Sequence, residues 1–187
     1  MFRPSYPIET ERLSLRPFEP GDFDAVYAIH SRADVARYLP WRPRDADGVR
    51  GALEQKLTRA ELIAEGDALN LAAVLRADGA LVGDCTLFWL SREHRRGEVG
   101  FIFHPDHHGK GLAREAAEAM LRVGFEGLGL HRIIGRLDAR NSASARVLER
   151  LGMRREAHLV ENELVKGEWC DELVYALLRA EWEKSRG

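Results

Sequence analysis

The sequence predicts a mixed α/β fold, and three features of its apolar pattern carry that prediction. Strand-forming runs between residues 68 and 103 predict three antiparallel strands, with turns at 77–79 and 95–97. The third strand, residues 98–103, leads through a glycine-containing loop into a long Ala-rich helix. Residues 133–137 are expected to form the next strand, which would lie parallel to residues 98–103 if this helix is a crossover connection.

Upstream of these strands, the pattern predicts one strand and two helices. The first strand covers residues 12–16 and ends at Pro17. Asp22 can cap the first helix that follows. A second helix is predicted because apolar residues recur on one helical face at Val49, Leu53, Leu57, Ala60 and Ala64. Gly66 is expected to end it.

Downstream of the glycine loop, further helices and strands complete the predicted fold. The crossover helix stops at residues 127–129, which contain two glycines. A short helix opens at Asn141 and stops at Gly152. Two strands, residues 154–161 and 168–178, finish the chain with a turn between them.

Composition restricts both the domain organisation and the classes of partner. With 187 residues, 45% of them hydrophobic, the chain can bury a sizeable core, and we expect one domain over residues 1–187. A formal net charge of -2 gives no general attraction to nucleic acid. The sequence lacks a signal-type apolar region and any run near the ~20 apolar residues of a membrane helix. Cys85 and Cys170 lack ligand spacing, so we expect reduced thiols in a cytoplasmic protein.

The loop between the third strand and the crossover helix contains Gly109, Lys110 and Gly111. The first turn of a helix has backbone N–H groups without intrahelical partners and carries partial positive charge, so it favours an anion. The dinucleotide pattern G-x-G-x-x-G is incomplete because Arg114 replaces its last glycine, and no Ser or Thr completes a Walker pattern. From these residues alone, an ordinary strand-to-helix turn is an equal alternative.

Three motifs together resemble one family of enzymes. The run His108-Gly109-Lys110-Gly111-Leu112-Ala113 fits the R/Q-x-x-G-x-G/A nucleotide loop of the GNAT superfamily of acyl-CoA-dependent N-acetyltransferases. Residues 98–153 as a whole resemble the core of that superfamily. Residues 8–17 and the pattern Asn141-x-x-Ser144-x-x-x-Leu148 are similar to the RimJ/RimL-like branch, the ribosomal-protein N-terminal acetyltransferases. The motifs occur in the family's order and cover nearly the whole chain, which makes coincidence improbable.

The resemblance implies a GNAT fold and acetyl-CoA as co-substrate. That fold is a mixed, mostly antiparallel sheet of about six or seven strands with a central splayed parallel pair, flanked by about four helices. The acyl-pantetheine arm is expected to pair with the strand edge formed by Phe101, Ile102 and Phe103. Backbone N–H groups of residues 109–113 are expected to hold the diphosphate, with Lys110 as a candidate cation. His108 stands where the pattern usually has Gln or Arg.

The implied reaction is attack of an amine on the thioester, with loss of coenzyme A as a thiol or thiolate. Glu98 begins the strand expected to hold the thioester, so it is the candidate general base, acting directly or through water. An ion pair with Arg95 or Arg96 at the end of the hairpin is an equal alternative for this carboxylate.

The resemblance also implies an acid for the leaving sulfur. Many family members use a tyrosine in the helix after the last parallel strand, and Leu148 occupies that position here. Ser144 is therefore the candidate acid, and Asn141 is expected to hydrogen-bond the pantetheine arm or the start of the helix. Helix capping is the alternative role for both residues.

The acceptor is expected to be a primary amine, first of all the α-amino group of a protein or peptide. Alternatives are a small amine, such as a polyamine, an amino-acid derivative or an aminoglycoside, and a non-catalytic acyl-CoA-binding regulatory domain. Tyr38 and Trp41 lie in a loop that would select the substrate, although aromatics there more often seal the edge of a core.

Other partners are restricted by what the sequence lacks. We expect no metal, because His104, His107 and His108 have no matching carboxylate or Cys ligands. We also expect neither a membrane nor direct nucleic-acid binding, and a monomer or a homodimer.

Overall fold

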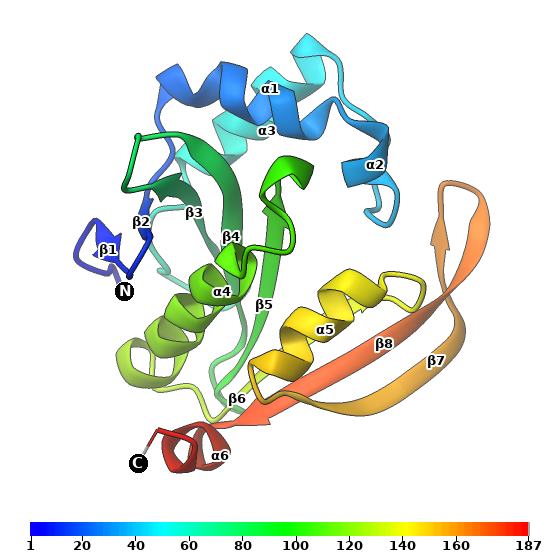
Figure 1. Cartoon of the computed structure of the whole chain (residues 1–187). Coiled ribbons are helices and arrows are strands. Elements are labelled where there is room, and N and C mark those ends of the chain that lie inside the picture. Colours follow the sequence, from blue (N-terminus) through cyan, green and yellow to red (C-terminus); the bar gives the residue numbers. More distant parts are fainter. Residues whose placement is uncertain (187) are drawn as a thin grey trace.

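One eight-stranded sheet forms the centre of the computed structural model, which describes residues 1–186 (Figure 1). Its strand order is β1-β2-β3-β4-β5-β6-β8-β7, and neighbours are antiparallel except for the parallel pair β5 and β6. The strands are β1 (Ile8–Glu9), β2 (Leu13–Arg16), β3 (Ala68–Leu75), β4 (Leu81–Ser91), β5 (Arg96–Phe103), β6 (Arg132–Asp138), β7 (Arg154–Val165) and β8 (Glu168–Leu178). The predicted mixed sheet is confirmed, with more strands than the sequence indicated.

Helices cover both faces of this sheet (Figure 1). They are α1 (Phe23–His30), α2 (Ala33–Ala36), α3 (Ala46–Leu57), α4 (Leu112–Arg122), α5 (Ser142–Arg150) and α6 (Arg179–Lys184). Ala72 of β3 belongs to a core cluster with side chains of α1 and α3, whereas its neighbours Leu71 and Ala73 belong to the cluster that contains α4 and α5 side chains. Successive strand residues point to opposite faces, so α1 and α3 lie on one face and α4 and α5 on the other.

Helix length and hydropathy bear on whether the chain can enter a lipid bilayer. Within residues 1–186, no helix combines enough length with enough apolar character to cross a membrane.

The parallel pair is in register over a short stretch and then separates. Arg96, Gly97 and Glu98 of β5 face Arg132, Ile133 and Ile134 of β6, and the ladder stops there. Beyond it, β5 continues to Phe103 and stays paired with β4, while β6 continues to Asp138 and stays paired with β8. This is the splayed pair that the sequence resemblance implied.

The predicted second helix is too long. In the structure, α3 ends at Leu57, so the prediction that Ala60 and Ala64 are helical is wrong. The segment after α3 is held by partners far along the chain: Leu62 forms a β-bridge with Phe2, and the Tyr6 hydroxyl donates to the Ala60 carbonyl at 2.6 Å. These tertiary contacts compete with helical hydrogen bonds, so apolar periodicity did not fix the end of the helix.

The turn expected at residues 95–97 ends two residues earlier than predicted. Residues 92–95 form the turn, and β5 begins at Arg96. Arg95 takes the left-handed backbone region that closes this turn, with a φ of 45°. The strand that carries Glu98 is therefore slightly longer than predicted.

A buried polar cluster lies beneath α1 and α3. Lys56 Nζ donates to Asp84 Oδ2 at 2.8 Å and to Asn70 Oδ1 at 2.9 Å, and all three side chains are largely buried. Nearby His30 is 3% exposed, and neither ring nitrogen has a hydrogen-bond partner among the described residues. Burial lowers the pKa of His30 to about 4, against the smaller opposing effect of the Asp84 charge.

The depressed pKa of His30 predicts acid lability. In the unfolded chain this pKa returns to about 6.5, so between about pH 6.5 and about pH 4 the unfolded state binds more protons than the folded state. The free energy of unfolding should therefore fall as the pH decreases, with about 2 kcal/mol attributable to His30 by about pH 5. Urea unfolding near pH 7.5 and near pH 5 should show a smaller loss in His30→Phe than in the wild type.

The matched control is His94→Gln, which changes an exposed histidine in the turn before β5. This variant should lose as much stability on acidification as the wild type. If His30→Phe also loses as much as the wild type, His30 is not the source of acid lability.

Candidate functional site

The loop after β5 enters α4 through two glycines in the left-handed backbone region. Gly109 has a φ of 74° and Gly111 a φ of 79°, angles that residues with a side chain rarely adopt. A 3-10 turn, Pro105–His107, precedes them, and Gly111 is the N-cap of α4. Because Gly111 has no side chain with which to cap the helix, the first-turn N–H groups remain open to an anion.

His108 closes this loop onto the strand before it. Its Nε2 lies 2.9 Å from the carbonyl oxygen of Phe103, and since a carbonyl can only accept, Nε2 carries the proton in this hydrogen bond. The imidazole thus stabilises the loop where the family pattern has a longer side chain. His104 and His107 lie edge to face at 6.2 Å, and residues 1–186 contain no group of three or more His, Cys, Asp or Glu side chains arranged as metal ligands.

The edge of β5 beyond Glu98 is open on the side of β6. Residues 99–103 pair with β4 on one side and have no β6 partner on the other. Phe103 is buried in the core cluster and Phe101 packs against it, whereas Ile102 points to the opposite face. The Phe101 and Phe103 side chains therefore anchor the strand in the core, while its backbone has no strand partner on the side of β6 and the Phe103 carbonyl pairs with His108.

Glu98 lies at the last paired position before the strands separate. Its partner is Arg136 of β6, whose Nη2 and Nε lie 3.0 Å and 3.1 Å from Glu98 Oε2. The expected alternative partners, Arg95 and Arg96, are therefore wrong. Glu98 is 13% exposed in its side chain, so a guanidinium holds a nearly buried carboxylate at the point of separation.

Further carboxylates surround Arg136. Glu172 of β8 lies 3.9 Å from Arg136 Nη1 and accepts a hydrogen bond from Asn162 at 3.0 Å. Burial raises the pKa of Glu172; Arg136 opposes that shift, while the charges of Glu163 and Glu98 add to it. Glu98 and Glu172 thus share one guanidinium, and the Glu163 carboxylate adds a further negative charge near it.

Asn141 and Ser144 differ in their structural roles. Asn141 Oδ1 accepts a hydrogen bond from the Ser144 backbone N–H at 3.1 Å and so caps α5. The Ser144 hydroxyl takes no part in this cap, and its side chain is half-buried. Leu148, at the usual tyrosine position, is buried against the backbone of Gly135. Capping therefore accounts for Asn141 but not for the Ser144 hydroxyl.

Tyr38 and Trp41 lie in the segment between α2 and α3. The Trp41 ring stacks on His30 with centroids 4.9 Å apart, and the Arg44 guanidinium lies over the Trp41 ring at 4.9 Å from its centroid. The Arg37 guanidinium lies 5.1 Å from the Tyr38 centroid. Both aromatic residues remain partly exposed. Trp41 therefore seals the buried histidine while keeping some accessible surface.

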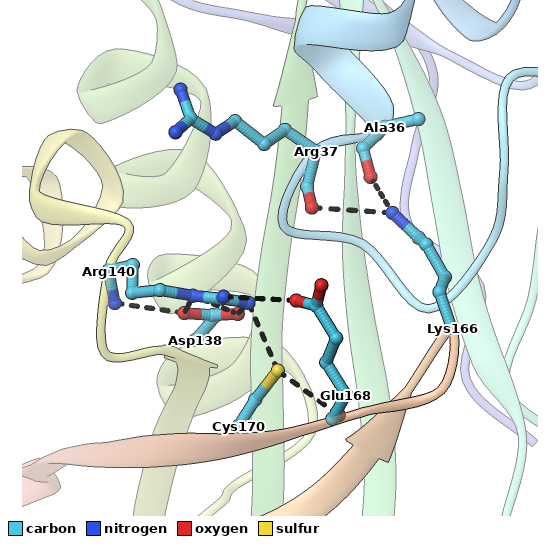
Figure 2. Close-up of polar contacts among 7 residues, drawn as sticks. All are labelled: Ala36, Arg37, Asp138, Arg140, Lys166, Glu168 and Cys170. Atoms are coloured by element: carbon cyan, nitrogen blue, oxygen red, sulfur yellow. Dashed lines mark hydrogen bonds and ion pairs between the residues drawn. The ribbon is translucent and has the colours of Figure 1, made fainter.

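Two polar links tie the β7–β8 hairpin to other parts of the chain (Figure 2). At the tip of the hairpin, Lys166 Nζ donates to the Ala36 carbonyl at 2.5 Å and lies 3.3 Å from the Arg37 carbonyl, at the end of α2. At the start of β8, Arg140 Nη2 lies 3.0 Å from Cys170 Sγ, while the same guanidinium pairs with Asp138.

The Lys166 link brings the tip of the β7–β8 hairpin to the end of α2, directly before the segment that contains Tyr38 and Trp41 and is expected to select the acceptor. Sequence reasoning did not find Lys166, Arg140 or Arg136 as site residues. Each pairs with a residue on another element, so no local pattern indicated its partner.

The geometry agrees with comparisons to known proteins. The family model described as an acetyltransferase (GNAT) domain matches residues 12–154. The uncharacterized N-acetyltransferase YnaD of Bacillus subtilis is 35% identical over 176 residues, covering 94% of this chain and 98% of that protein. A solved GNAT-family acetyltransferase from Bacillus anthracis has a TM-score of 0.84 at 35% identity, covering 97% of this chain and 100% of its own. The chain therefore belongs to the GNAT family and is an acetyl-CoA-dependent N-acetyltransferase.

Two relatives of lower identity have names that state an acceptor. The spermidine N(1)-acetyltransferase of Escherichia coli is 28% identical over 157 residues, covering 84% of this chain and 81% of that protein. The putative ribosomal N-acetyltransferase YdaF of Bacillus subtilis is 28% identical over 177 residues, covering 92% of this chain and 94% of that protein. The two names agree on acetyl transfer to an amine and differ in the acceptor.

The glycine loop generates a prediction about coenzyme binding. Gly111→Val should weaken acetyl-CoA binding about tenfold or more, because a β-branched residue at a φ of 79° must shift the backbone that presents the first-turn N–H groups. Isothermal titration calorimetry with acetyl-CoA measures this change directly.

The matched control is Gly79→Val in the β3–β4 turn. Gly79 has a similar φ of 76° and open space around it, so the variant carries the same backbone strain away from the loop. Its acetyl-CoA affinity should equal that of the wild type. Unchanged affinity in Gly111→Val would contradict the assignment of this loop to the coenzyme.

Proposed function

We propose that this enzyme acetylates the α-amino group of a protein or peptide, as the RimJ/RimL-like branch of the family does. The observation that carries the proposal is the Glu98–Arg136 pair at the point where β5 and β6 separate. Because the Arg136 guanidinium occupies Glu98 Oε2, only the other carboxylate oxygen is free to accept a proton from the amine. An α-amino group, with a pKa of ~8, is partly neutral near pH 7 and needs less help than a lysine-like amine at ~10.4.

In the proposed complex, acetyl-CoA lies between the separated strands. The pantetheine amides pair with the open edge of β5 at Phe101, Ile102 and Phe103. The N–H groups of residues 109–113 at the start of α4 bind the diphosphate, and Lys110 supplies a nearby charge. Asn141 keeps the start of α5 in place through its cap.

The proposed chemistry follows from this placement. The amine nitrogen attacks the thioester carbonyl, and Glu98 takes the proton that the nitrogen loses, directly or through water. The carbon–sulfur bond then breaks, and the Ser144 hydroxyl gives its proton to the leaving sulfur and regains one from solvent. A hydroxyl that is half-buried and outside the α5 cap is free for this role.

A second candidate acceptor is a polyamine. Glu98, Glu172 and Glu163 outnumber the guanidinium of Arg136, and such an excess of negative charge attracts a molecule with several ammonium groups. One relative is named a spermidine acetyltransferase.

A thiol-release assay with acetyl-CoA separates these candidates. Peptides with varied N-terminal residues should give a higher kcat/KM than spermidine and aminoglycosides. The control is the same peptide with a blocked N-terminus and an internal lysine, which should release no thiol. Faster release with spermidine would replace the first candidate by the second, and binding of acetyl-CoA without release for any amine would contradict both.

The role of Glu98 can be tested through pH. Glu98→Gln should lower turnover most at low pH, where the amine is protonated and a base is needed, so the variant-to-wild-type ratio should rise with pH. Turnover between about pH 6.5 and about pH 9 measures this ratio. Glu93→Gln, in the exposed turn before β5, is the control and should give a constant ratio near one. A constant, lowered ratio in Glu98→Gln would remove Glu98 from proton transfer.

Ser144 offers a separate test because its backbone, rather than its side chain, joins the cap of α5. Ser144→Ala should lower kcat about tenfold or more and leave acetyl-CoA affinity unchanged, since only the proposed proton donor is lost. Turnover and calorimetry on the same preparation separate the two quantities. Ser142→Ala, at the exposed first position of α5, should keep full activity. Full activity in Ser144→Ala would exclude the hydroxyl from catalysis.

A further inference from the structure

Arg12 joins the N-terminal segment to the glycine loop. Its Nη1 donates to the Lys110 carbonyl at 2.8 Å, and its Nε pairs with Glu115 of α4 at 2.7 Å. The Arg12 backbone N–H donates to the other Glu115 oxygen at 2.7 Å, and the Thr10 hydroxyl donates to that same oxygen at 2.6 Å. Two residues just before β2 thus hold both the loop and the first turns of the helix.

The Lys110 carbonyl is the informative contact because it belongs to the peptide group between Lys110 and Gly111. A trans peptide is planar, and its C=O and N–H point in opposite directions. Fixing the oxygen on one side therefore fixes the direction of the Gly111 N–H on the other.

This peptide group needs such a restraint. It lies between two glycines in the left-handed region, Gly109 and Gly111, and glycine adopts φ of either sign at little cost. The Arg12 guanidinium lies directly against it, since Nη2 is 3.4 Å from the position that a Cβ on Gly111 would take.

Glu115 holds the guanidinium in place. Partial burial of this carboxylate favours its neutral form, but hydrogen bonds from Thr10 and Arg12 outweigh burial and lower the pKa of Glu115. Glu115 is thus ionised at neutral pH, and with its side chain 15% exposed, it pairs with Arg12 in partial shelter from water.

We propose that Arg12 is a positioning residue for the coenzyme: through the Lys110 carbonyl, it directs the Gly111 N–H toward the coenzyme diphosphate. This inference rests on the proposed function, because it takes the glycine loop as the diphosphate site. Arg12 acts through the backbone, and its own charge is balanced by Glu115.

The decisive comparison is Arg12→Gln with Arg76→Gln. Arg76 holds the same N-terminal segment through the Thr10 carbonyl at 2.8 Å and through Glu9 at 3.1 Å, without a hydrogen bond or ion pair to the glycine loop or Glu115 among the described residues. Loss of either arginine should loosen residues 9–12, and only the loss of Arg12 should release the Lys110–Gly111 peptide.

Arg12→Gln should raise the acetyl-CoA Kd and KM about tenfold, with kcat and the KM of the amine nearly unchanged. Arg76→Gln should keep wild-type values of all four. Arg12→Lys keeps the charge, but a lysine lacks the planar set of guanidinium N–H donors that holds Glu115 and the Lys110 carbonyl together. This variant should therefore recover only part of the acetyl-CoA affinity. The backbone amide signal of Gly111 should shift in Arg12→Gln and stay in place in Arg76→Gln.

Calorimetry on Arg12→Gln, Arg76→Gln and Gly111→Val distinguishes the failure of each idea. If Gly111→Val weakens binding but Arg12→Gln does not, the loop holds the coenzyme and the positioning role is wrong. Equal losses in Arg12→Gln and Arg76→Gln, or full recovery in Arg12→Lys, would also overturn it. If neither Gly111→Val nor Arg12→Gln changes binding, the coenzyme loop itself is wrong.

Discussion

The short parallel ladder between β5 and β6 is the constraint on which the site depends. It pairs residues 96–98 with residues 132–134 and then stops, while each strand stays anchored to an antiparallel neighbour on its outer side. The β5 edge is therefore held by β4 on one side and has no strand partner on the other. An unpaired strand edge in the middle of a sheet leaves backbone donors and acceptors without partners, and a co-substrate that carries amides can satisfy them.

Charge is arranged around this opening in two separate groups. On the side of α4, free N–H groups and the dipole of the helix favour the phosphates of the coenzyme. On the side of β8, Glu98 and Glu172 lie near Arg136 and favour an amine that arrives as a cation. In the proposed complex, the donor and the acceptor of the acetyl group thus meet surfaces of opposite charge, which separates their binding regions before any contact with the reacting atoms.

Much of the fold could be predicted because its signals are local. The glycine loop, the crossover helix and the strands on either side follow from short-range pattern, and the Asn141 cap follows from residue type and position. The end of α3 was missed because Phe2 and Tyr6 hold the chain after it. Glu98 was located in its strand but given the wrong partner, since Arg136 is a neighbour only after the parallel strands meet.

The Tyr38 and Trp41 segment could be named from the sequence, but its link to the β7–β8 hairpin could not. Tyr38 and Trp41 precede the hairpin tip by more than a hundred residues, and one lysine joins the two regions through backbone carbonyls. Carbonyl oxygens are present at every residue, so no side-chain pattern near α2 could have indicated Lys166 as their partner.

If the segment between α2 and α3 selects the acceptor, as the sequence predicts, the Lys166 link makes acceptor preference a joint property of that segment and the β7–β8 hairpin. A hairpin of different length, transplanted from a relative, would carry its tip away from the Ala36 carbonyl and leave the end of α2 without that donor. The segment between α2 and α3 would then lose the support that the hairpin gives it. Exchange of acceptor specificity among relatives by loop grafting therefore requires both segments to be moved together, as a matched pair.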